Sequence, residues 1–407
     1  MNVPKKHTIL VVDDEKANIN VMIGLLKNDY RVLIAKSGEK ALQVVSISKP
    51  DLILLDIMMP EMDGYEVCRR LKADEKNKNI PVVFISAKSE ENDETKGLKL
   101  GAIDYITKPI SPPIVLARIK IHLELKLAKE KLEKKFQEAK IANHQIMESI
   151  RYAGMIQNSL LPDPELIQAN LPDSFYIWLP RDIVGGDIFF YDFFNRGMVA
   201  AVVDCTGHGV PGALMSMIAS SGLRQIVSHE KCHDPAEILK KMNYFVKISL
   251  LQDASHAESD DGMDMSVCFF DKNEQTLIFS GARHFLFYTN ENELAFIKGD
   301  RQSIGYKKSD LSFEFTNHHI KIQSDMNFYM ASDGFTDQLG GRKRRSFGRK
   351  RFNKLLKENH QLPFDIQQKL LLEAFETYRG DNDRLDDVTV IGFNLNSFQE
   401  KSTEQQD

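Results

Sequence analysis

Apolar and polar residues alternate in two different ways along residues 8–124. Short, β-branched apolar runs predict buried parallel strands, because such strands are covered on both faces. These runs are Thr8–Val12, Arg31–Ala35, Leu52–Leu55, Val82–Ile85 and Asp104–Ile106. Helical patterns separate them at Asn18–Lys27, Glu39–Ile47, Tyr65–Ala73, Glu94–Leu100 and Pro113–Leu123. Strand–helix units in series predict a doubly wound α/β domain over residues 5–124, with ligands at the carboxyl ends of its strands.

A second pattern continues from the last of these helices. Between Ile114 and Ala153 there is no Gly or Pro, so we expect one helical linker over residues 114–160. Apolar positions recur every seven residues at Leu125, Leu132, Ala139, Ile146, Ala153 and Leu160, and a partner seam contains Phe136, Asn143 and Ile150. This spacing favours a coiled coil, and with it a homodimer. The small alanines weaken the seam, so a solvated connector helix on its own domain is the alternative.

Residues 155–398 form a third segment of mixed character. Strand-like runs are Met198–Val203, Met265–Phe270, Leu277–Ser280, Phe285–Tyr288, Asn327–Ala331 and Val388–Phe393. Helical stretches are Ala213–Val227, Ala236–Leu251 and Phe364–Tyr378. We therefore expect an α+β domain, with a mixed, mainly antiparallel β core flanked by helices. The polar residues 399–407 are expected to form a flexible tail.

Composition narrows the class of protein. The chain has 407 residues, 42% of them hydrophobic and 27% charged, which is typical of a globular protein with two or three domains. A net charge of −5 gives no general attraction to nucleic acid. The four cysteines form no CxxC pair, which fits a reducing compartment without a disulfide framework. Without a secretory signal or a long apolar stretch, we expect a cytoplasmic protein with no membrane contact.

The first domain carries polar residues where its predicted strands end. Asp13 and Asp14 follow the first strand, Asp56 ends the third, Ser86 ends the fourth and Lys108 follows the fifth. The ends of parallel strands converge, so the carboxylates should share one pocket with the lysine. Crowded carboxylates repel one another unless a cation lies among them, and Mg²⁺ prefers oxygen ligands. Asp56 is then a candidate nucleophile toward phosphorus.

These features in this order resemble the receiver domain of response regulators. The resemblance implies that Asp56 accepts phosphate from a histidine kinase or phosphotransfer protein. It also implies that Asp14 binds Mg²⁺ directly, with Asp13 assisting. Ser86 and Tyr105 would be the switch residues and Lys108 the phosphate-contacting lysine, with a cis bond before Pro109. Nothing in the segment departs from this pattern.

The third segment holds a second set of carboxylates in tight turns. Asp187 lies in VGGD, Asp204 precedes CTGHG, Asp333 lies in SDG, and Asp386 and Asp387 precede VTV. Adjacent glycines let the backbone approach an ion or a phosphate. Carboxylates without His or Cys ligands suit Mg²⁺ or Mn²⁺, and two such ions can clamp a phosphoryl group. Any one of these motifs alone is more simply a hairpin turn.

Together, these motifs resemble those of SpoIIE-like members of the PPM (type 2C) protein phosphatases. The resemblance implies two Mn²⁺ or Mg²⁺ ions bridged by Asp204, one of them also bound by the backbone carbonyl of Cys205. Asp333 and Asp386 would complete the other ion's site, Asp187 would hold metal-bound water, and Asp387 is a further contributor. Cys205 stands where many relatives have Gly, which a carbonyl ligand tolerates.

Other motifs have two interpretations each. The acidic loop His256–Asp264 could supply Asp260, Asp261 or Asp264 to a third metal, but a solvated loop is favoured. Arg181 could hold substrate phosphate or be an ordinary surface residue, and His208 could act as an acid or shape its turn. The basic run over residues 342–351 resembles a nucleic-acid patch, but has no DNA-binding motif around it. A solvated loop or a contact with an acidic protein partner is preferred.

The leading hypothesis is a two-component response regulator whose output is a metal-dependent protein serine/threonine phosphatase, controlled by phosphorylation of Asp56. By resemblance its substrate is a STAS-type anti-sigma-factor antagonist. One alternative is a non-catalytic scaffold that binds a partner-switching protein under receiver control. Another is a DNA-binding transcription factor. The sequence argues against it, because no helix-turn-helix pattern follows residue 124.

Overall fold

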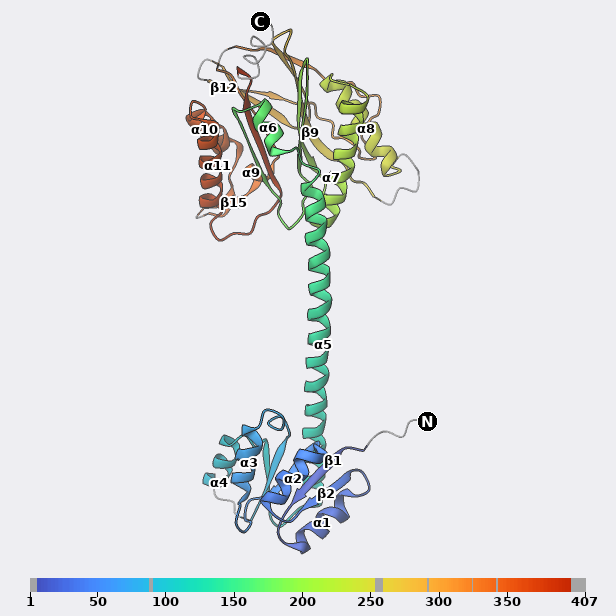
Figure 1. The fold of residues 1–407 in the computed structure, drawn as a ribbon, viewed down its shortest axis with the longest axis vertical. Coiled ribbons are helices and arrows are strands. Elements are labelled where there is room, and N and C mark those ends of the chain that lie inside the picture. The colour runs from blue at the N-terminus through green and yellow to red at the C-terminus, as the bar shows by residue number, and fades with distance from the viewer. Residues whose placement is uncertain are drawn as a thin grey trace. The chain divides into compact units, whose positions relative to one another are not determined.

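The computed structural model describes residues 6–87, 91–252, 259–290, 293–323, 325–341 and 343–396, with the backbone alone for residues 91–94. It divides into two compact units, residues 1–143 and 144–407, which are described separately. Figure 1 labels their elements. Helix α5 (Pro112–Asn158) contains residues of both units.

The first unit is built on one parallel sheet with strand order β2-β1-β3-β4-β5. Its strands are β1 (Thr8–Val12), β2 (Arg31–Ala35), β3 (Leu52–Asp56), β4 (Val82–Ser86) and β5 (Asp104–Thr107). Its helices are α1 (Lys16–Leu26), α2 (Gly38–Ser48), α3 (Gly64–Ala73), α4 (Glu91–Lys99) and the beginning of α5. The predicted doubly wound α/β fold is confirmed, with β1 and β2 at their predicted bounds and the other element ends within three residues of those predicted, apart from the end of α5.

Successive residues of the central strands enter different cores on the two faces of this sheet. Leu10 of β1 and Ile53 of β3 pack with α2 and α3, whereas Ile9 and Leu54 pack with α1 and the start of α5. All four side chains are fully buried. Burial on both faces explains why these strands read as continuous apolar runs. Because both faces of the sheet are covered, polar functional side chains can reach solvent only at the ends of the strands.

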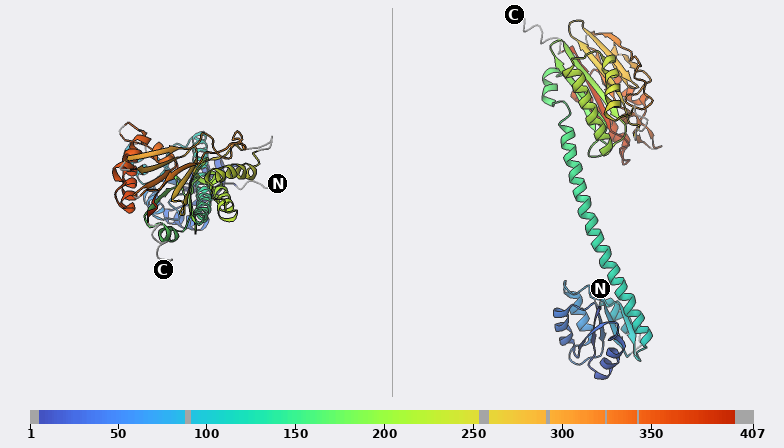
Figure 2. Two further views of the ribbon diagram at one scale, coloured as in Figure 1. Left: turned by 90° about the horizontal axis from the view of Figure 1, so that it is seen from above. Right: turned by 90° about the vertical axis from the view of Figure 1, so that its right-hand side faces the viewer.

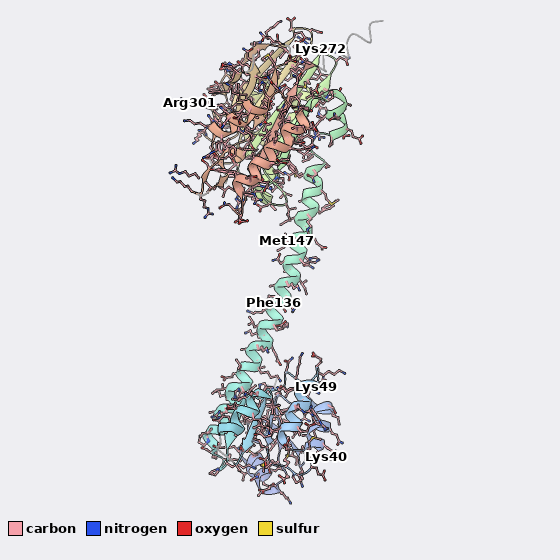
Figure 3. All side chains as sticks on the ribbon, turned by 90° about the vertical axis from the view of Figure 1, so that its left-hand side faces the viewer. Lys40, Lys49, Phe136, Met147, Lys272 and Arg301 are labelled. Atoms are coloured by element: carbon pink, nitrogen blue, oxygen red, sulfur yellow. The ribbon has the colours of Figure 1, made fainter. Side chains whose placement is uncertain are left out.

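Helix α5 is continuous, as its composition predicts, and ends two residues before Leu160. Its first turns are anchored in the receiver core by Val115, Ile119 and Leu123. Further along, large apolar side chains are exposed: Leu132 is 70% exposed and Phe136 63% exposed. Figure 3 shows Phe136 and Met147 projecting outward from the helix. Whether these side chains pair with a second helix stays a prediction.

The second unit contains two five-stranded sheets, ordered β13-β10-β9-β8-β7 and β12-β11-β14-β17-β6, with antiparallel ladders throughout. The strands of the first sheet are β7 (Ile188–Phe194), β8 (Gly197–Cys205), β9 (Met263–Asp271), β10 (Thr276–Ala282) and β13 (His318–Lys321). Those of the second are β6 (Ser174–Leu179), β11 (Phe285–Asn290), β12 (Glu293–Lys298), β14 (Asn327–Ala331) and β17 (Val388–Asn394). A short hairpin, β15 (Leu339–Gly340) and β16 (Arg345–Ser346), stands apart.

Helices cover the outer faces of both sheets. Helices α7 (Gly209–Leu223) and α8 (Pro235–Ser249), joined by a π-helical turn (Arg224–His229), pack on the first sheet. Helices α10 (Arg349–Asn359) and α11 (Phe364–Arg379) pack on the second. Figures 1 and 2 show these helix pairs on opposite sides of the strands. With α6 (Pro164–Asn170) and α9 (Gly334–Asp337), this confirms the predicted antiparallel core with flanking helices.

An apolar layer between the two sheets holds them together. Phe270 and Phe279 of the first sheet meet Phe328 and Phe393 of the second, and all four are fully buried. Aromatic side chains remove the largest apolar area from water, on the order of 150–250 Å² each, so this layer contributes strongly to stability. It fixes the strand ends of both sheets at one edge of the domain, where the second carboxylate set lies.

Candidate functional site

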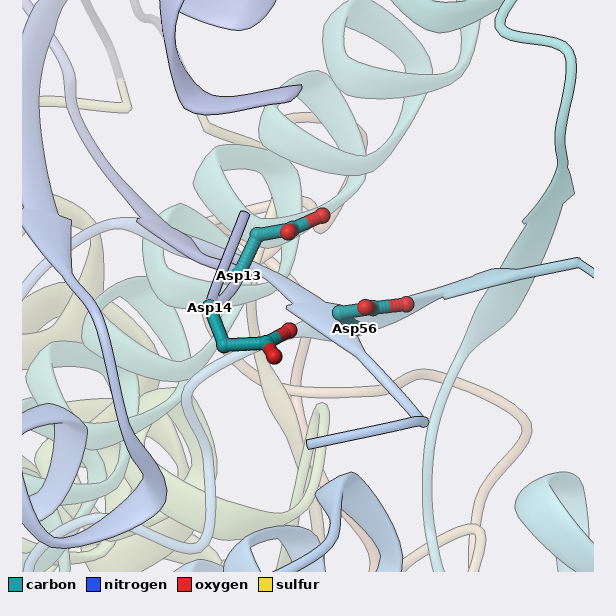
Figure 4. Close-up of side chains that lie close together, drawn as sticks. All are labelled: Asp13, Asp14 and Asp56. Carbon is teal, nitrogen blue, oxygen red and sulfur yellow. The ribbon is translucent and has the colours of Figure 1, made fainter. Parts of the chain in front are cut away.

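Three carboxylates of the receiver unit converge at the carboxyl end of its sheet. Asp13 and Asp14 follow β1, and Asp56 ends β3. One oxygen from each lies within 4.8 Å of the others. Figure 4 shows the three side chains close together. Asp13 and Asp56 are buried, while Asp14 is exposed. Three oxygen donors at this spacing, one of them open to solvent, fit a Mg²⁺ ion.

Lys108 and Asn18 hold this cluster together. The Nζ atom of Lys108 lies 3.1 Å from Oδ2 of Asp13 and 3.2 Å from Oδ1 of Asp56. The amide of Asn18 donates to both oxygens of Asp13, at 3.1 and 3.0 Å. Burial raises the pKa of Asp56, and the charge of Asp13 adds to this, while Lys108 opposes it. Asn18 carries no motif signal, so sequence reasoning missed it.

The predicted switch residues lie next to this cluster. Ser86 ends β4 and is buried, and Tyr105 lies on the adjacent β5. Both line a small cavity of about 10 Å³ beside Phe84. The peptide bond between Lys108 and Pro109 is cis, as predicted.

The second carboxylate set lies in the other unit, where its members interact electrostatically with Asp204. Asp204 lies near the end of β8, Asp187 precedes β7, Asp333 follows β14 and Asp386 precedes β17. Burial raises the pKa of Asp187 well above its ordinary value, and the charge of Asp204 raises it further. The pKa of Asp333 is raised to about 7, and that of Asp386 is raised as well, again by burial with a contribution from Asp204. The charge of Asp204 therefore acts on three predicted carboxylates that lie at the ends of different strands.

The glycines next to Asp187 permit close approach of the backbone. A Cβ atom on Gly186 would lie 2.6 Å from the carbonyl oxygen of Gly207 and 2.9 Å from that of Cys205. Both distances are shorter than real Cβ contacts, so this position requires glycine. The carbonyl of Cys205 thus lies against the loop that carries Asp187, which is where a backbone ligand is expected.

Asp387 and Ser332 fix this loop. The Asp387 carboxylate accepts the backbone N–H of Arg181 at 2.6 Å and also that of Gly186. The hydroxyl of Ser332 donates to Oδ2 of Asp187 at 2.6 Å. Both oxygens of Asp387 are thus engaged by backbone donors. Ser332 belongs to the SDG motif, but its role was not anticipated.

Gln157 of α5 is a second residue that sequence reasoning missed. It is almost completely buried, and its amide donates to the carbonyl oxygen of Gly185 and, at 2.8 Å, to the hydroxyl of Ser216. Its own carbonyl oxygen accepts the N–H of Gly185 at 3.1 Å. The end of α5 is therefore bonded directly to the loop before Asp187.

Asp264 lies opposite Asp204 on adjacent strands, since the ladder of β8 and β9 pairs these two residues. Its Oδ1 is buried and has no hydrogen-bond partner within the described chain, and burial raises its pKa. The prediction of a solvated loop is therefore wrong for Asp264, because the strand begins earlier than its apolar pattern indicates. Asp260 caps the N–H of Lys307, and residues 256–258 lie outside the described part.

The remaining candidates are less central. His208 precedes α7, and its Nδ1 lies 3.3 Å from Oδ2 of Asp182. The side chain of Arg181 is exposed. The basic run is not simply a loop: Arg345 belongs to β16, and Arg349 begins α10, while residue 342 lies outside the described part. Helix α10 was not predicted, because the basic residues at its start obscure its amphipathic period.

The chemistry of this cluster fits divalent cations. Within the described residues, no Lys or Arg forms an ion pair with Asp187, Asp204, Asp333 or Asp386. The one ion-pair contact of Asp204 in that part of the chain is His284, whose Nε2 lies 3.9 Å from its Oδ2. Asp187 is buried, whereas Asp333 and Asp386 are exposed. Carboxylates that repel one another are stabilised by a cation among them, and hard oxygen ligands suit Mg²⁺ or Mn²⁺.

Comparison with known proteins identifies the family of each domain. The family model for the response regulator receiver domain matches residues 9–120, and that for stage II sporulation protein E (SpoIIE) matches residues 195–396. The solved SiaA-PP2C domain of Pseudomonas aeruginosa is 32% identical, with a TM-score of 0.57, over 62% of this chain and 98% of that domain. The chain belongs to the SpoIIE-like PPM phosphatase family and carries a response regulator receiver domain.

Curated relatives match the receiver domain. A probable cyclic di-GMP phosphodiesterase of Vibrio cholerae is 45% identical over 30% of this chain and 28% of its own length. The alkaline phosphatase synthesis transcriptional regulatory protein PhoP of Bacillus subtilis is 46% identical over 28% of this chain and 46% of its own. The chain thus spans less than half the length of these relatives. In the part that the structure describes, no helix combines the length and apolarity needed to cross a bilayer.

Proposed function

We propose that the SpoIIE domain hydrolyses phosphoserine or phosphothreonine on a protein, and that phosphorylation of Asp56 by a histidine kinase or phosphotransfer protein controls it. The observation that carries this proposal is that the charge of Asp204 raises the pKa values of Asp187, Asp333 and Asp386, while no Lys or Arg pairs with these carboxylates in the described chain. Such a cluster is stable when cations bind it.

Each residue of the carboxylate set has a proposed role in this reaction. Asp204, the carbonyl of Cys205, Asp333 and Asp386 would hold two Mn²⁺ or Mg²⁺ ions, which supply Lewis acidity and lower the pKa of water when bound. Asp187 would orient water, and the hydrogen bond from Ser332 would hold its carboxylate in place. Asp387 would position the glycine loop through its backbone contacts.

The receiver site supports phosphoryl transfer to Asp56. Asp13 and Asp14 would bind Mg²⁺, and Lys108 already contacts the acceptor carboxylate. A phosphate there adds roughly −1.5 to −2 charge, which would draw in Ser86 and Lys108 and reorient Tyr105. Labelling with a small phosphate donor in Mg²⁺ tests this: wild type and Asp29→Ala should take up phosphate, and Asp56→Ala should not. Labelling of Asp56→Ala would contradict the assignment.

For the substrate we propose a STAS-type anti-sigma-factor antagonist, and for the assembly a homodimer paired along α5. The support for the substrate is the family resemblance. The support for the dimer is the row of exposed apolar side chains that includes Leu125, Leu132 and Phe136.

Turnover of p-nitrophenyl phosphate and of a phosphorylated STAS protein tests the catalytic proposal. Activity should require Mn²⁺ or Mg²⁺ and stop with EDTA. Asp204→Asn should lower it by about three orders of magnitude, since its loss affects both ions. The matched control Asp365→Asn, an exposed carboxylate on α11, should retain it. Binding of the STAS protein without hydrolysis would instead support the scaffold alternative.

A further inference from the structure

A cavity of about 200 Å³ in the SpoIIE domain is lined in part by Asp333 of the carboxylate set. Asp264, His284 and Asp333 are among its lining residues. Its aromatic lining consists of Phe285, Phe287 and Phe352, and its cationic lining of Arg283 and Arg349. Pockets for drug-sized ligands are about 300–1,000 Å³, so this one suits one or two side chains.

His284 indicates that the cavity has an occupant. The residue is only 6% exposed, and neither ring nitrogen has a hydrogen-bond partner within the described chain. Its Nε2 lies 3.9 Å from Oδ2 of Asp204, so the ring stands between the metal cluster and the cavity. Buried polar groups are nearly always hydrogen-bonded, and an unpaired one points to a ligand.

Arg349 indicates that the occupant is an anion. It begins α10, whose first turn contains Arg349, Lys350 and Arg351 and no acidic residue. Cations at a helix N-terminus are unfavourable, because the helix dipole is positive there. Arg351 is used structurally, donating to the carbonyl oxygen of Phe347 at 2.6 Å. The guanidinium of Arg349 instead lies 3.9 Å from the centre of the Phe285 ring, which holds it on the cavity wall.

We propose that this cavity is a substrate subsite that binds an acidic side chain next to the phosphorylated residue, and that Arg349 selects it. The inference rests on the proposed function, in which the phosphoryl group binds at the neighbouring carboxylate cluster. His284 then donates a hydrogen bond to the substrate chain as it passes between the two sites. The Phe285 ring supports the guanidinium and the apolar part of the acidic side chain.

Binding of non-hydrolysable peptides tests the subsite independently of catalysis. Fluorescent peptides carry a phosphonate analogue of phosphoserine and differ only in Glu or Gln at the preceding or the following position. Their affinities for the full chain are measured in Mn²⁺ by fluorescence anisotropy. At one of these two positions, the wild-type protein should bind the Glu peptide about tenfold more tightly than the Gln peptide, as expected for a charge-assisted hydrogen bond.

Substitutions assign this preference to one residue. Arg349→Glu should bring the Glu/Gln affinity ratio to about one or invert it, and Arg349→Gln should reduce it. Lys350→Glu makes the same charge change on the same helical turn without lining the cavity, and should leave the ratio unchanged. A wild-type ratio near one, an unchanged ratio in both Arg349 variants, or an equal loss in Lys350→Glu would overturn the proposal. Selective binding in a protein that does not hydrolyse p-nitrophenyl phosphate would refute the catalytic function and leave the subsite standing.

Discussion

The side chain of Gln157 bonds to both backbone groups of Gly185. It donates to the carbonyl oxygen and accepts the N–H, the latter at 3.1 Å. Gly186, the next residue, is held by Asp387, and Asp187 follows. The last turns of α5 and the candidate metal site are therefore separated by one side chain and two residues of loop.

Replacing Gln157 by Ala should impair the metal site without unfolding the domain. The change leaves both backbone groups of Gly185 without their buried partner, at a cost of about 1–3 kcal/mol per unsatisfied group. We expect Mn²⁺ affinity and turnover of p-nitrophenyl phosphate to fall by about tenfold or more. Gln145→Ala, on an exposed face of α5 in the same unit, is the control. Wild-type metal affinity in Gln157→Ala, measured by calorimetry, would contradict this coupling.

Thiol-blocking reagents should leave the activity intact. Burial raises the pKa of the Cys205 thiol well above its ordinary value, and the charge of Asp204 raises it further. Burial also raises the pKa of Cys68, Cys232 and Cys268. Because the thiolate is the reactive form, alkylation near neutral pH should be slow. Turnover is measured after iodoacetamide, with mass spectrometry to locate any adduct. Loss of activity in proportion to alkylation of Cys205 would argue against a purely backbone role.

The metal-free SpoIIE domain should lose stability as the pH rises through about 7. Desolvation, together with the charges of Asp204, Asp337 and Asp386, raises the pKa of Asp333 to about 7, whereas an unfolded Asp titrates at about 3.9. The folded state therefore binds this proton more tightly. Its contribution to stability is fully present below about pH 4 and is lost as the pH rises through the folded value.

Metal binding reverses this dependence, because the ion replaces the proton. Thermal unfolding at about pH 6 and about pH 8, in EDTA and in Mn²⁺, measures both effects. We expect the gain in melting temperature from Mn²⁺ to be larger at the higher pH. In EDTA, Asp333→Asn should be less sensitive to pH than wild type. An equal gain from Mn²⁺ at both pH values would show that protonation does not compete with the metal.

The receiver fold could be predicted almost completely from its sequence. Its strands are buried on both faces, so runs such as Leu52–Leu55 carry a strong signal, and their ends locate Asp13 and Asp56. In the SpoIIE domain the signal is weaker. β7 is a nearly continuous aromatic run with no clear period, and α10 is masked by basic residues.

The carboxylate motifs could be recognised, but their partners could not. Gln157 lies on a helix whose composition is polar, so nothing in the sequence distinguishes it from exposed glutamines such as Gln145. Asp264 looks like the end of an acidic loop, and the strand ladder alone places it opposite Asp204. His284 has no motif and becomes informative only because its buried nitrogens lack partners within the described chain.

The last prediction concerns α5 as the element that transmits the receiver signal. Its first turns are packed in the receiver core by Val115 and Ile119, and its last turns are bonded by Gln157 to the loop that precedes Asp187. Between them the helix is continuous, with exposed apolar residues at heptad spacing, such as Leu125 and Leu132. A phosphorylation-dependent change in helix pairing can therefore alter the position of Gln157. A tenfold change in activity requires only about 1.4 kcal/mol of differential stabilisation.

Two Gly residues inserted after Lys140 should uncouple the domains, because they weaken the helix by about 1 kcal/mol each and rotate the later seam by about 200°. The matched control duplicates residues 134–140, which lengthens the helix by one heptad and preserves the seam. We expect the ratio of phosphatase activities with and without acetyl phosphate to fall to about one in the Gly variant and to persist in the control. Sedimentation should show the same degree of dimerisation for the Gly variant and the heptad control, so that a difference in their activity ratios cannot come from a difference in association. A wild-type ratio in the Gly variant would exclude α5 as the transmitting element, because no helical register would then connect Asp56 with Gln157.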